Sequence, residues 1–167
     1  MKTFYLLRHA KSSWDEPGLA DFDRPLNKRG RSAAPRMGVL MAERGLMPEV
    51  ILCSTALRAR QTVEHIVPAS SYSGPIEFTD ELYLAPADVY LDLLTEIDDA
   101  FSAVMMVGHN PGISNALLHL TGSGKHFPTA ALAKISLPIT AWREFDESVQ
   151  GELAEFWRPK ELDELSS

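Results

Sequence analysis

Four short apolar runs alternate along the chain with longer segments in which apolar residues recur at helical spacing. The runs at residues 4–7, 50–53 and 104–107 have the length and composition of buried strands, and residues 76–79 form a shorter, weaker strand pattern. The segments between them predict helices over residues 28–44, 57–67, 86–97 and 111–120. This alternation favours an α/β fold with a mostly parallel sheet, helices on both faces and right-handed crossovers.

Capping residues mark the expected ends of these helices. Asn27 precedes the first helix and Gly45 follows it, in the positions that these residue types favour. The Ser54 and Thr55 pair has the hydroxyl groups to cap the second helix, and Asn110 stands where a cap for the fourth would be. The helix boundaries therefore follow from local sequence signals.

The last third of the chain has a different pattern. Residues 131–137 and 153–157 resemble strands separated by a polar stretch, and we expect them to pair antiparallel or at an edge of the sheet. Together these elements predict a single three-layer domain over residues 1–158. The remaining residues, 159–167, are acidic, and we expect them to form a frayed tail.

Composition limits the class of protein. With 167 residues and 45% apolar content, the chain can bury a core without metals or disulfides. The single cysteine, Cys53, excludes an internal disulfide and a cysteine-based zinc site. No apolar run approaches the ~18 residues of a membrane helix, and Arg8 interrupts the first run before it could form a signal sequence. We expect a cytoplasmic protein with no membrane partner.

The charge is unevenly distributed along the chain. A net charge of −7 argues against a nucleic-acid partner. Residues 1–70 contain 11 Lys and Arg against 7 Asp and Glu, whereas residues 71–167 contain 5 against 16. The positive charge thus lies in the half that begins with Arg8 and His9. Part of it fits a solvated face of the first helix, formed by Arg29, Arg31, Arg36 and Arg44.

Polar residues of related chemistry follow three of the predicted strands. Arg8 and His9 follow the first strand, Ser54 and Arg58 follow the second, and His109 follows the fourth. Because the carboxyl ends of parallel strands meet at one edge of a sheet, we expect these side chains to converge. Guanidinium groups and helix N-termini match the oxygens of a tetrahedral dianion. The sequence therefore predicts a phosphate site.

Other phosphate chemistries fit poorly. A cysteine phosphatase would need an arginine six positions after Cys53, where Ala59 stands. The run at residues 122–125 has part of a P-loop pattern, but His126 occupies the position that requires Ser or Thr. The histidines have no carboxylates at ligand spacing, so we expect no metal and no other cofactor.

Three motifs carry a resemblance to a known family. LLRHAKSSW, CSTALRARQT and VGHNP occur in that order, and they resemble the signatures of the histidine phosphatase superfamily, the phosphoglycerate-mutase-like enzymes. The resemblance spans residues 3 to about 120, with Ala10 where many members have glycine. The short length, DFDRPLNKRG and PTAALAKISLP are similar to the SixA branch of phosphohistidine phosphatases.

The resemblance implies roles for individual residues. His9 would attack phosphorus and become a phosphohistidine, which water then hydrolyses. Arg8, Arg58 and His109 would hold the phosphoryl oxygens and offset their charge. Ser12 matches a phosphate-contacting position, although its hydroxyl would serve equally well in a local turn.

The sequence does not decide which residue, if any, donates a proton to the leaving group. Glu81 lies near the position where relatives have an acidic residue, but it fits an ordinary exposed acid equally well. An imidazole leaving group needs less help from an acid than an alkoxide does. Only about one helix fits between Pro68 and Ala103, whereas relatives that act on small phosphate esters often have a helical insertion there. A site without such a cover would admit a protein surface.

Three functions agree with these observations. The first is hydrolysis of phosphohistidine on a protein, and the second is hydrolysis of a small phosphorylated metabolite. The third is a phosphate-reading interaction module without turnover. Because Arg8, His9, Arg58 and His109 are all present, the sequence favours an enzyme.

Overall fold

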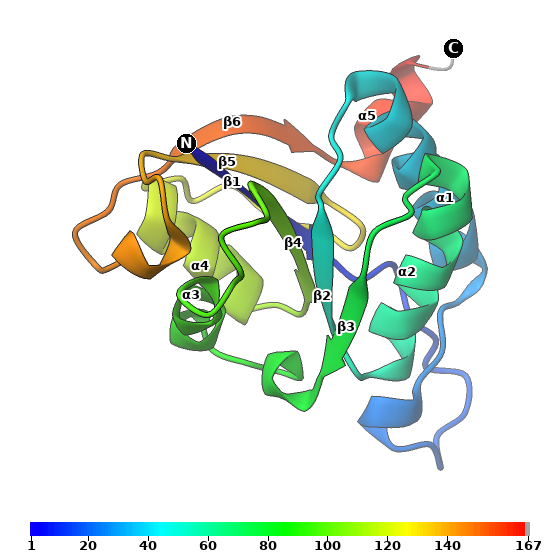
Figure 1. Ribbon diagram of the computed structural model, residues 1–167. Coiled ribbons are helices and arrows are strands. Elements are labelled where there is room, and N and C mark those ends of the chain that lie inside the picture. Colours follow the sequence, from blue (N-terminus) through cyan, green and yellow to red (C-terminus); the bar gives the residue numbers. More distant parts are fainter. Residues whose placement is uncertain (166–167) are drawn as a thin grey trace.

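A six-stranded sheet in the order β3-β2-β4-β1-β5-β6 forms the middle layer of the protein (Figure 1). The structure is a computed structural model that describes residues 1–165. Its strands are β1 (Lys2–Arg8), β2 (Val50–Ser54), β3 (Ile76–Thr79), β4 (Ala103–Gly108), β5 (Leu132–Leu137) and β6 (Glu152–Trp157).

The first four strands run parallel, as the alternation of strand and helix patterns predicts. β4 pairs with β1 on one side and β2 on the other, and β3 extends the sheet beyond β2. β5 pairs antiparallel with β1, and β6 pairs antiparallel with β5 at the edge. The expected antiparallel addition from the last third of the chain is therefore confirmed.

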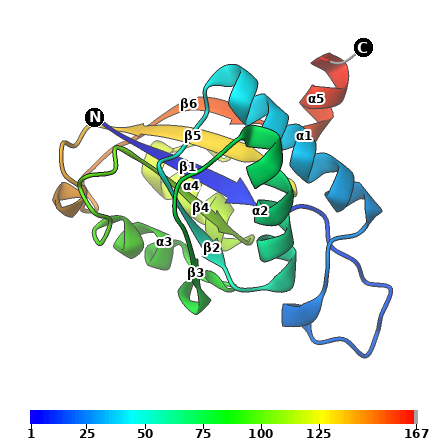
Figure 2. The ribbon, with the colours of Figure 1, turned by 45° about the vertical axis from the view of Figure 1, so that its right-hand side comes forward.

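Helices cover both faces of the sheet, which confirms the expected α/β class (Figures 1 and 2). One face carries α1 (Lys28–Arg44), α2 (Leu57–Ser70) and α5 (Pro159–Leu165), and the other carries α3 (Ala87–Leu94) and α4 (Gly112–Thr121). Three short 3-10 helices lie in the connections: η1 (Asp21–Asp23), η2 (Asp80–Leu82) and η3 (Trp142–Glu144).

Alternate residues of β1 pack into two separate hydrophobic clusters. Phe4 and Leu6 belong to the cluster under α3 and α4, and Tyr5 and Leu7 belong to the cluster under α1 and α2. All four side chains are buried, because helices cover the sheet on both sides. This double burial explains why the strand is apolar throughout and does not alternate with polar residues.

The expected caps hold for α1 but not for α2. Asn27 Oδ1 accepts a hydrogen bond from the peptide N–H of Gly30 at 2.9 Å, and Gly45 ends the helix with φ at 65°. By contrast, α2 begins after Ala56 and has no side-chain cap. Ser54 and Thr55 lie too early in the chain to cap it, and Thr55 donates its hydroxyl to Asp80 instead.

The remaining helix boundaries differ from expectation by a few residues. α2 continues past residue 67 to Ser70, and α3 ends at Leu94 before the expected residue 97. α4 begins at Gly112, and Asn110 Oδ1 accepts hydrogen bonds from the peptide N–H and the hydroxyl of Ser114. Helix ends fray and are hard to locate from sequence. No helix among the described residues has the length and apolar character needed to span a membrane.

The segment that we expected to be a frayed tail forms α5 over Pro159–Leu165. The side chain of Leu162 is buried in the cluster under α1 and α2, and α5 packs against α1. Burial of Leu162 stabilises the packing of this short helix on the protein. The acidic composition of the segment does not indicate such packing. Residues 166–167 lie outside the described part of the chain.

Candidate active site

The parallel sheet brings the two predicted histidines together. β1 and β4 are neighbours in register, with Arg8 beside Gly108, so His9 and His109 follow adjacent strand ends. Their ring centroids are 5.1 Å apart, and the peptide N–H of His9 donates to the carbonyl of Gly108 at 3.0 Å. The convergence that the sequence pattern predicts is therefore present in the fold.

His9 is held as a neutral imidazole with one nitrogen available. Its Nδ1 lies 2.7 Å from the carbonyl oxygen of Ala10, which can only accept, so Nδ1 carries the proton. The lone pair is then on Nε2. Burial lowers the pKa of His9 to about 3 despite that hydrogen bond, and the nearby His109, Arg58 and Arg8 act in the same direction as burial. The ring is thus neutral at neutral pH, and Nε2 has the free lone pair that a nucleophile needs.

His109 is also buried and neutral. Burial, followed by the charge of Arg58, lowers the pKa of His109 to about 4. Its Nε2 lies 2.7 Å from the hydroxyl oxygen of Ser54, and its peptide N–H donates to the Tyr90 hydroxyl at 3.1 Å. A Cβ at Gly108 would lie 2.0 Å from that hydroxyl, so only glycine permits this support of His109.

The two arginines reach the same region from different elements. Arg8, at the end of β1, donates from Nη1 to the carbonyl of Phe127 at 2.9 Å. Arg58, in the first turn of α2, is 3% exposed, and it donates to the carbonyl of Asp21 at 2.7 Å and to its carboxylate at 3.0 Å. These contacts use the terminal nitrogens of both groups and leave the Nε–H groups free.

Three buried nitrogen atoms lack a hydrogen-bond partner among the described residues: Arg8 Nε, Arg58 Nε and His109 Nδ1. They belong to the three residues that we expected to hold phosphate oxygens. An unpaired buried donor costs about 1–3 kcal/mol, so three around one histidine indicate that an acceptor-rich ligand completes the site. A phosphoryl group supplies such acceptors.

An acidic residue that sequence reasoning missed organises the arginines. Besides Arg58, the Asp21 carboxylate accepts hydrogen bonds from the Tyr83 hydroxyl at 2.6 Å and from Arg24 Nε and Nη2 at 3.2 and 3.1 Å. Burial alone would raise its pKa, but the hydrogen bond from Tyr83 and the charge of Arg58 lower the pKa of Asp21 to about 2. Asp21 is therefore an anion that positions Arg58.

The segment DFDRPLNKRG contained the signal for this network, since it places Asp21 and Arg24 three residues apart. The Tyr83 ring also lies edge-on to His109, with centroids 5.6 Å apart. Asp21 thus connects Arg58 with Tyr83, which contacts His109, and these residues are distant in sequence.

Ser12 is connected to Asp21 through Arg24. Its hydroxyl accepts a hydrogen bond from Arg24 Nη1 at 2.8 Å. The preceding loop is fixed to α2, because the peptide N–H of Ala10 donates to Thr62 Oγ1 at 2.9 Å and Thr62 donates to the carbonyl of Arg58 at 2.7 Å. The observed contact of Ser12 is thus one that supports the loop.

The structure does not bring Glu81 together with the other predicted site residues. Glu81 lies in η2, is exposed, and lines a shallow cavity with Leu93 and Ile97. Its carboxylate forms no hydrogen bond or ion pair with any described residue; its peptide N–H donates to Thr79 Oγ1. Nor do any three His, Cys, Asp or Glu side chains within the described residues gather as a metal site would require.

Known proteins are similar to this chain in sequence and in fold. The model of the histidine phosphatase superfamily (branch 1) matches residues 4–83. The uncharacterized protein ML1117 of Mycobacterium leprae is 34% identical over 167 residues, covering 92% of this chain and 100% of the relative.

Two solved structures resemble the chain over nearly its whole length. A proposed phosphohistidine phosphatase SixA from Agrobacterium tumefaciens is 34% identical, with a TM-score of 0.81, and covers 95% of this chain and 98% of that one. A second proposed SixA, from Nakamurella multipartitia, is 30% identical, with a TM-score of 0.80 and coverage of 95% and 96%. Because motifs, fold and full-length similarity agree, the chain belongs to the histidine phosphatase superfamily and is of the SixA type.

Proposed function

We propose that this protein is a phosphatase that hydrolyses phosphohistidine on a protein substrate through a covalent phosphohistidine on His9. The observation that carries the proposal is the set of unpaired buried donors on Arg8, Arg58 and His109 around a neutral His9. Membership of the superfamily implies a hydrolase that acts on phosphorylated substrates.

The first half of the reaction is transfer to the enzyme. The three donors bind the phosphoryl oxygens and offset their charge, and His9 Nε2 attacks phosphorus in line with the leaving nitrogen. The new bond joins His9 Nε2 to phosphorus while the substrate's P–N bond breaks. The substrate ring, already protonated on its other nitrogen, leaves as neutral imidazole, so no strong acid is needed.

The second half is hydrolysis. A water molecule attacks the phosphorus of the phosphorylated His9, the P–Nε2 bond breaks, and inorganic phosphate leaves. His9 returns to the neutral form that burial favours. The side chains of Arg8, Arg58 and His109 supply the positive charge and the donors of this cycle, so we propose that turnover is independent of metal ions.

Two observations favour a protein substrate over a small ester. The segment between β3 and β4 contains only η2 and α3, and α3 packs beside α4 on one face of the sheet. It therefore supplies no large insertion of the kind that would enclose a small molecule. Two solved relatives with at least 30% identity are also described as proposed phosphohistidine phosphatases.

Acid quenching during turnover tests the nucleophile. Mass spectrometry of the quenched wild-type protein should find a phosphoryl group on His9, and His9→Ala should abolish both the label and turnover. His119→Ala is the matched control, because His119 is exposed on α4. A phosphoryl group on another residue, or activity without His9, would contradict the proposal.

A substrate panel tests the specificity. In the presence of EDTA, the protein should dephosphorylate phosphohistidine proteins with a higher kcat/KM than sugar phosphates. A preference for a sugar phosphate would instead identify a metabolite phosphatase. Failure to turn over any substrate, combined with phosphate binding, would identify an interaction module.

A further inference from the structure

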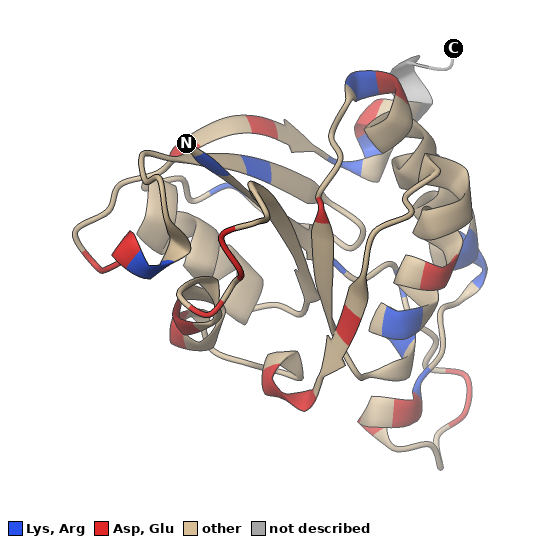
Figure 3. Ribbon diagram, viewed as in Figure 1, with Lys and Arg blue, Asp and Glu red and all other residues tan. Residues whose placement is uncertain are grey.

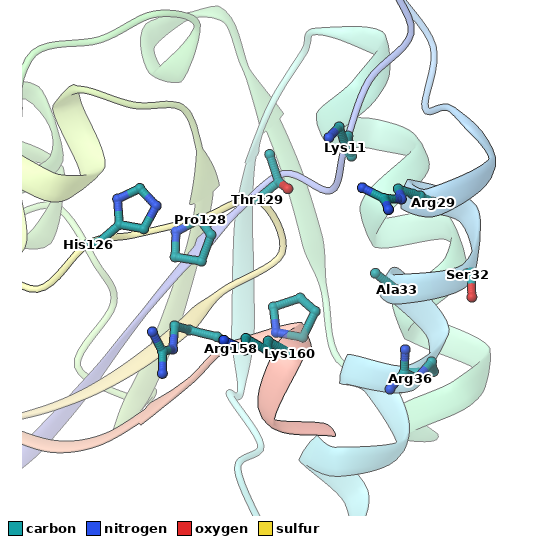
Figure 4. Close-up of a pocket in the computed structure, with 11 residues that line it drawn as sticks. Lys11, Arg29, Ser32, Ala33, Arg36, His126, Pro128, Thr129, Arg158 and Lys160 are labelled. Atoms are coloured by element: carbon teal, nitrogen blue, oxygen red, sulfur yellow. The ribbon is translucent and has the colours of Figure 1, made fainter. Parts of the chain in front are cut away.

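A basic groove with a volume of about 700 Å³ lies beside the proposed catalytic site (Figure 4). Its walls are α1, the segment at residues 126–129 and the beginning of α5. None of the described residues that line it is acidic. Its basic lining consists of Lys11, Arg29, Arg36, His126, Arg158 and Lys160.

The groove and the proposed catalytic site share their walls. Lys11 follows His9 by two residues. On the opposite wall, Phe127 accepts the hydrogen bond from Arg8, and the peptide N–H of Ala130 lies 3.1 Å and 3.0 Å from the carbonyl oxygens of Arg8 and His9. A molecule with its phosphoryl group at His9 would therefore have neighbouring atoms over the groove.

The position of Lys11 against α1 is fixed by close backbone contact. The peptide N–H of Asn27 donates to the carbonyl of Lys11 at 2.9 Å, and a Cβ at Gly30 would lie 2.2 Å from the same oxygen. Only glycine allows α1 to approach so closely. Figure 4 shows the result: Lys11 and Arg29 lie at one end of the groove, and Lys160 lies toward the other.

Part of the charge of this groove has no acidic partner among the described residues. Lys11, Arg29 and Lys160 are exposed, and no acidic side chain among those the structure describes pairs with them. Arg158 contributes less, since its Nε lies 2.9 Å from a carboxylate oxygen of Glu161. Three cations without an acidic partner among the described residues thus line one groove in a chain whose net charge is −7.

This arrangement replaces part of the solvated helix face expected for α1. Arg31 donates to the carbonyl of Leu26 at 2.9 Å, and Arg44 lies over the ring of Trp157, whereas Arg29 lines the groove. Figure 3 shows acidic positions on α3 and η2, on the other side of the sheet from the basic positions of α1. The basic positions of α1 and the acidic positions of α3 and η2 therefore lie on opposite sides of the sheet.

We propose that the groove receives an acidic segment of the phosphohistidine-bearing protein, and that Lys11, Arg29 and Lys160 select the substrate by charge. This inference rests on the function proposed above. The cations come from three separate parts of the chain, and they are spread along more space than a second phosphate would need. Long, exposed basic side chains adapt to a protein surface, and complementary charge orients the encounter and raises its rate.

Paired peptide substrates test the inference directly. Two phosphohistidine peptides of equal length would be compared, one with Asp and Glu around the phosphohistidine and one with Ser and Gln. The wild-type protein should favour the acidic peptide about ten-fold in kcat/KM at low salt, and the preference should fall as salt rises. The double variant Arg29→Glu/Lys160→Glu should lose the preference, and turnover of phosphoramidate should stay unchanged.

The matched control is Lys28→Glu/Arg143→Glu, which changes the net charge equally. Both residues are exposed and outside the groove, and η3, which contains Arg143, lies at the opposite end of the sheet from α1 (Figures 1 and 2). The control should keep the preference for the acidic peptide.

Each contrary outcome has a separate meaning. Hydrolysis of both peptides with no loss of preference in the groove variant would overturn the inference and leave the proposed function intact. If the control variant lost the preference for the acidic peptide to the same extent, the effect would be due to net charge. That result would also overturn the inference about the groove. If the wild-type protein hydrolyses phosphoramidate but neither peptide, the proposed function fails, and the inference fails with it.

Discussion

The hydroxyl oxygen of Ser54 lies 2.7 Å from Nε2 of His109, and the same oxygen is 3.3 Å from the peptide N–H of Ala56. Because that N–H can only donate, the serine oxygen accepts from it and is free to give its own proton to His109 Nε2. With Ser54 as the donor, the proton of the neutral His109 is on Nδ1, the atom that has no partner among the described residues. In this arrangement, which we propose for the enzyme, His109 Nδ1–H would donate to the phosphoryl group of the substrate.

Ser54→Ala should remove this control of the tautomer. We expect kcat to fall by about ten-fold to a hundred-fold, with a smaller change in KM, because the lost donor acts most strongly as charge develops. The ¹⁵N chemical shifts of His109 should report protonated Nδ1 in the wild type and a mixture in the variant. Thr55→Ala is the control, since its hydroxyl bonds to Asp80. An unchanged tautomer would contradict the positioning role.

Arg58→Lys should recover little of the activity lost in Arg58→Ala. A lysine cannot contact both Asp21 and a phosphoryl oxygen with a rigid fork, as the guanidinium can. We expect each change to lower kcat/KM by about 10² to 10³, measured with phosphohistidine peptide. Arg60→Ala should be nearly silent, because Arg60 is exposed and lies over Phe78. Full activity in Arg58→Lys would indicate that charge alone suffices.

Glu81→Gln should leave kcat/KM within about two-fold for both phosphohistidine and an alkyl phosphate ester. The carboxylate is exposed in η2 and forms no hydrogen bond or ion pair with a described residue. The departing imidazole of phosphohistidine also needs little help from an acid. The measurement is kcat/KM for both substrates in the wild type and in the variant. The loss on the alkyl ester is then divided by the loss on phosphohistidine. A selective loss on the alkyl ester would instead identify Glu81 as the proton donor for that class.

Stability should fall as the pH is lowered from 6.5 to 5. In the folded protein, burial lowers the pKa of His9 to about 3 and that of His109 to about 4, whereas both titrate near ~6.5 when unfolded. The unfolded chain therefore binds more protons in this window. The free energy of unfolding should decrease by up to about 1.4 kcal/mol per pH unit for each histidine.

Denaturant unfolding at several pH values measures this slope. His9→Asn should show a shallower slope than the wild type, because one of the two buried imidazoles is gone. A slope that does not change would assign the acid sensitivity to other groups.

The sequence predicted the parts of the site that follow strand ends. Arg8, His9 and His109 could be placed together because strand direction alone brings their positions to one edge. Ser54 was expected both to converge with these residues and to cap the following helix. Its contact with His109 confirms the convergence. The cap was wrong because α2 begins after Ala56 and has no side-chain cap.

The rest of the site depends on contacts that local pattern cannot reveal. Asp21 meets Arg58 and Tyr83 across 37 and 62 residues, and only the folded chain brings them together. The docking of α5 is similar, because its burial depends on Leu162, a single apolar residue in an acidic segment. Local propensity and periodicity therefore predict elements and strand ends, but not long-range polar networks.

The strand that directly precedes His9, β1, has a paired neighbour on each side, β4 in one direction and β5 in the other. A strand in this position exchanges its amide hydrogens only when the sheet opens, so β1 should be among the slowest segments to exchange. The proposed nucleophile, His9, is therefore attached to a strand that we expect to be among the last to unfold. Heat should destroy turnover and the far-ultraviolet circular dichroism signal at the same temperature, which would make residual activity a direct gauge of how much protein is still folded.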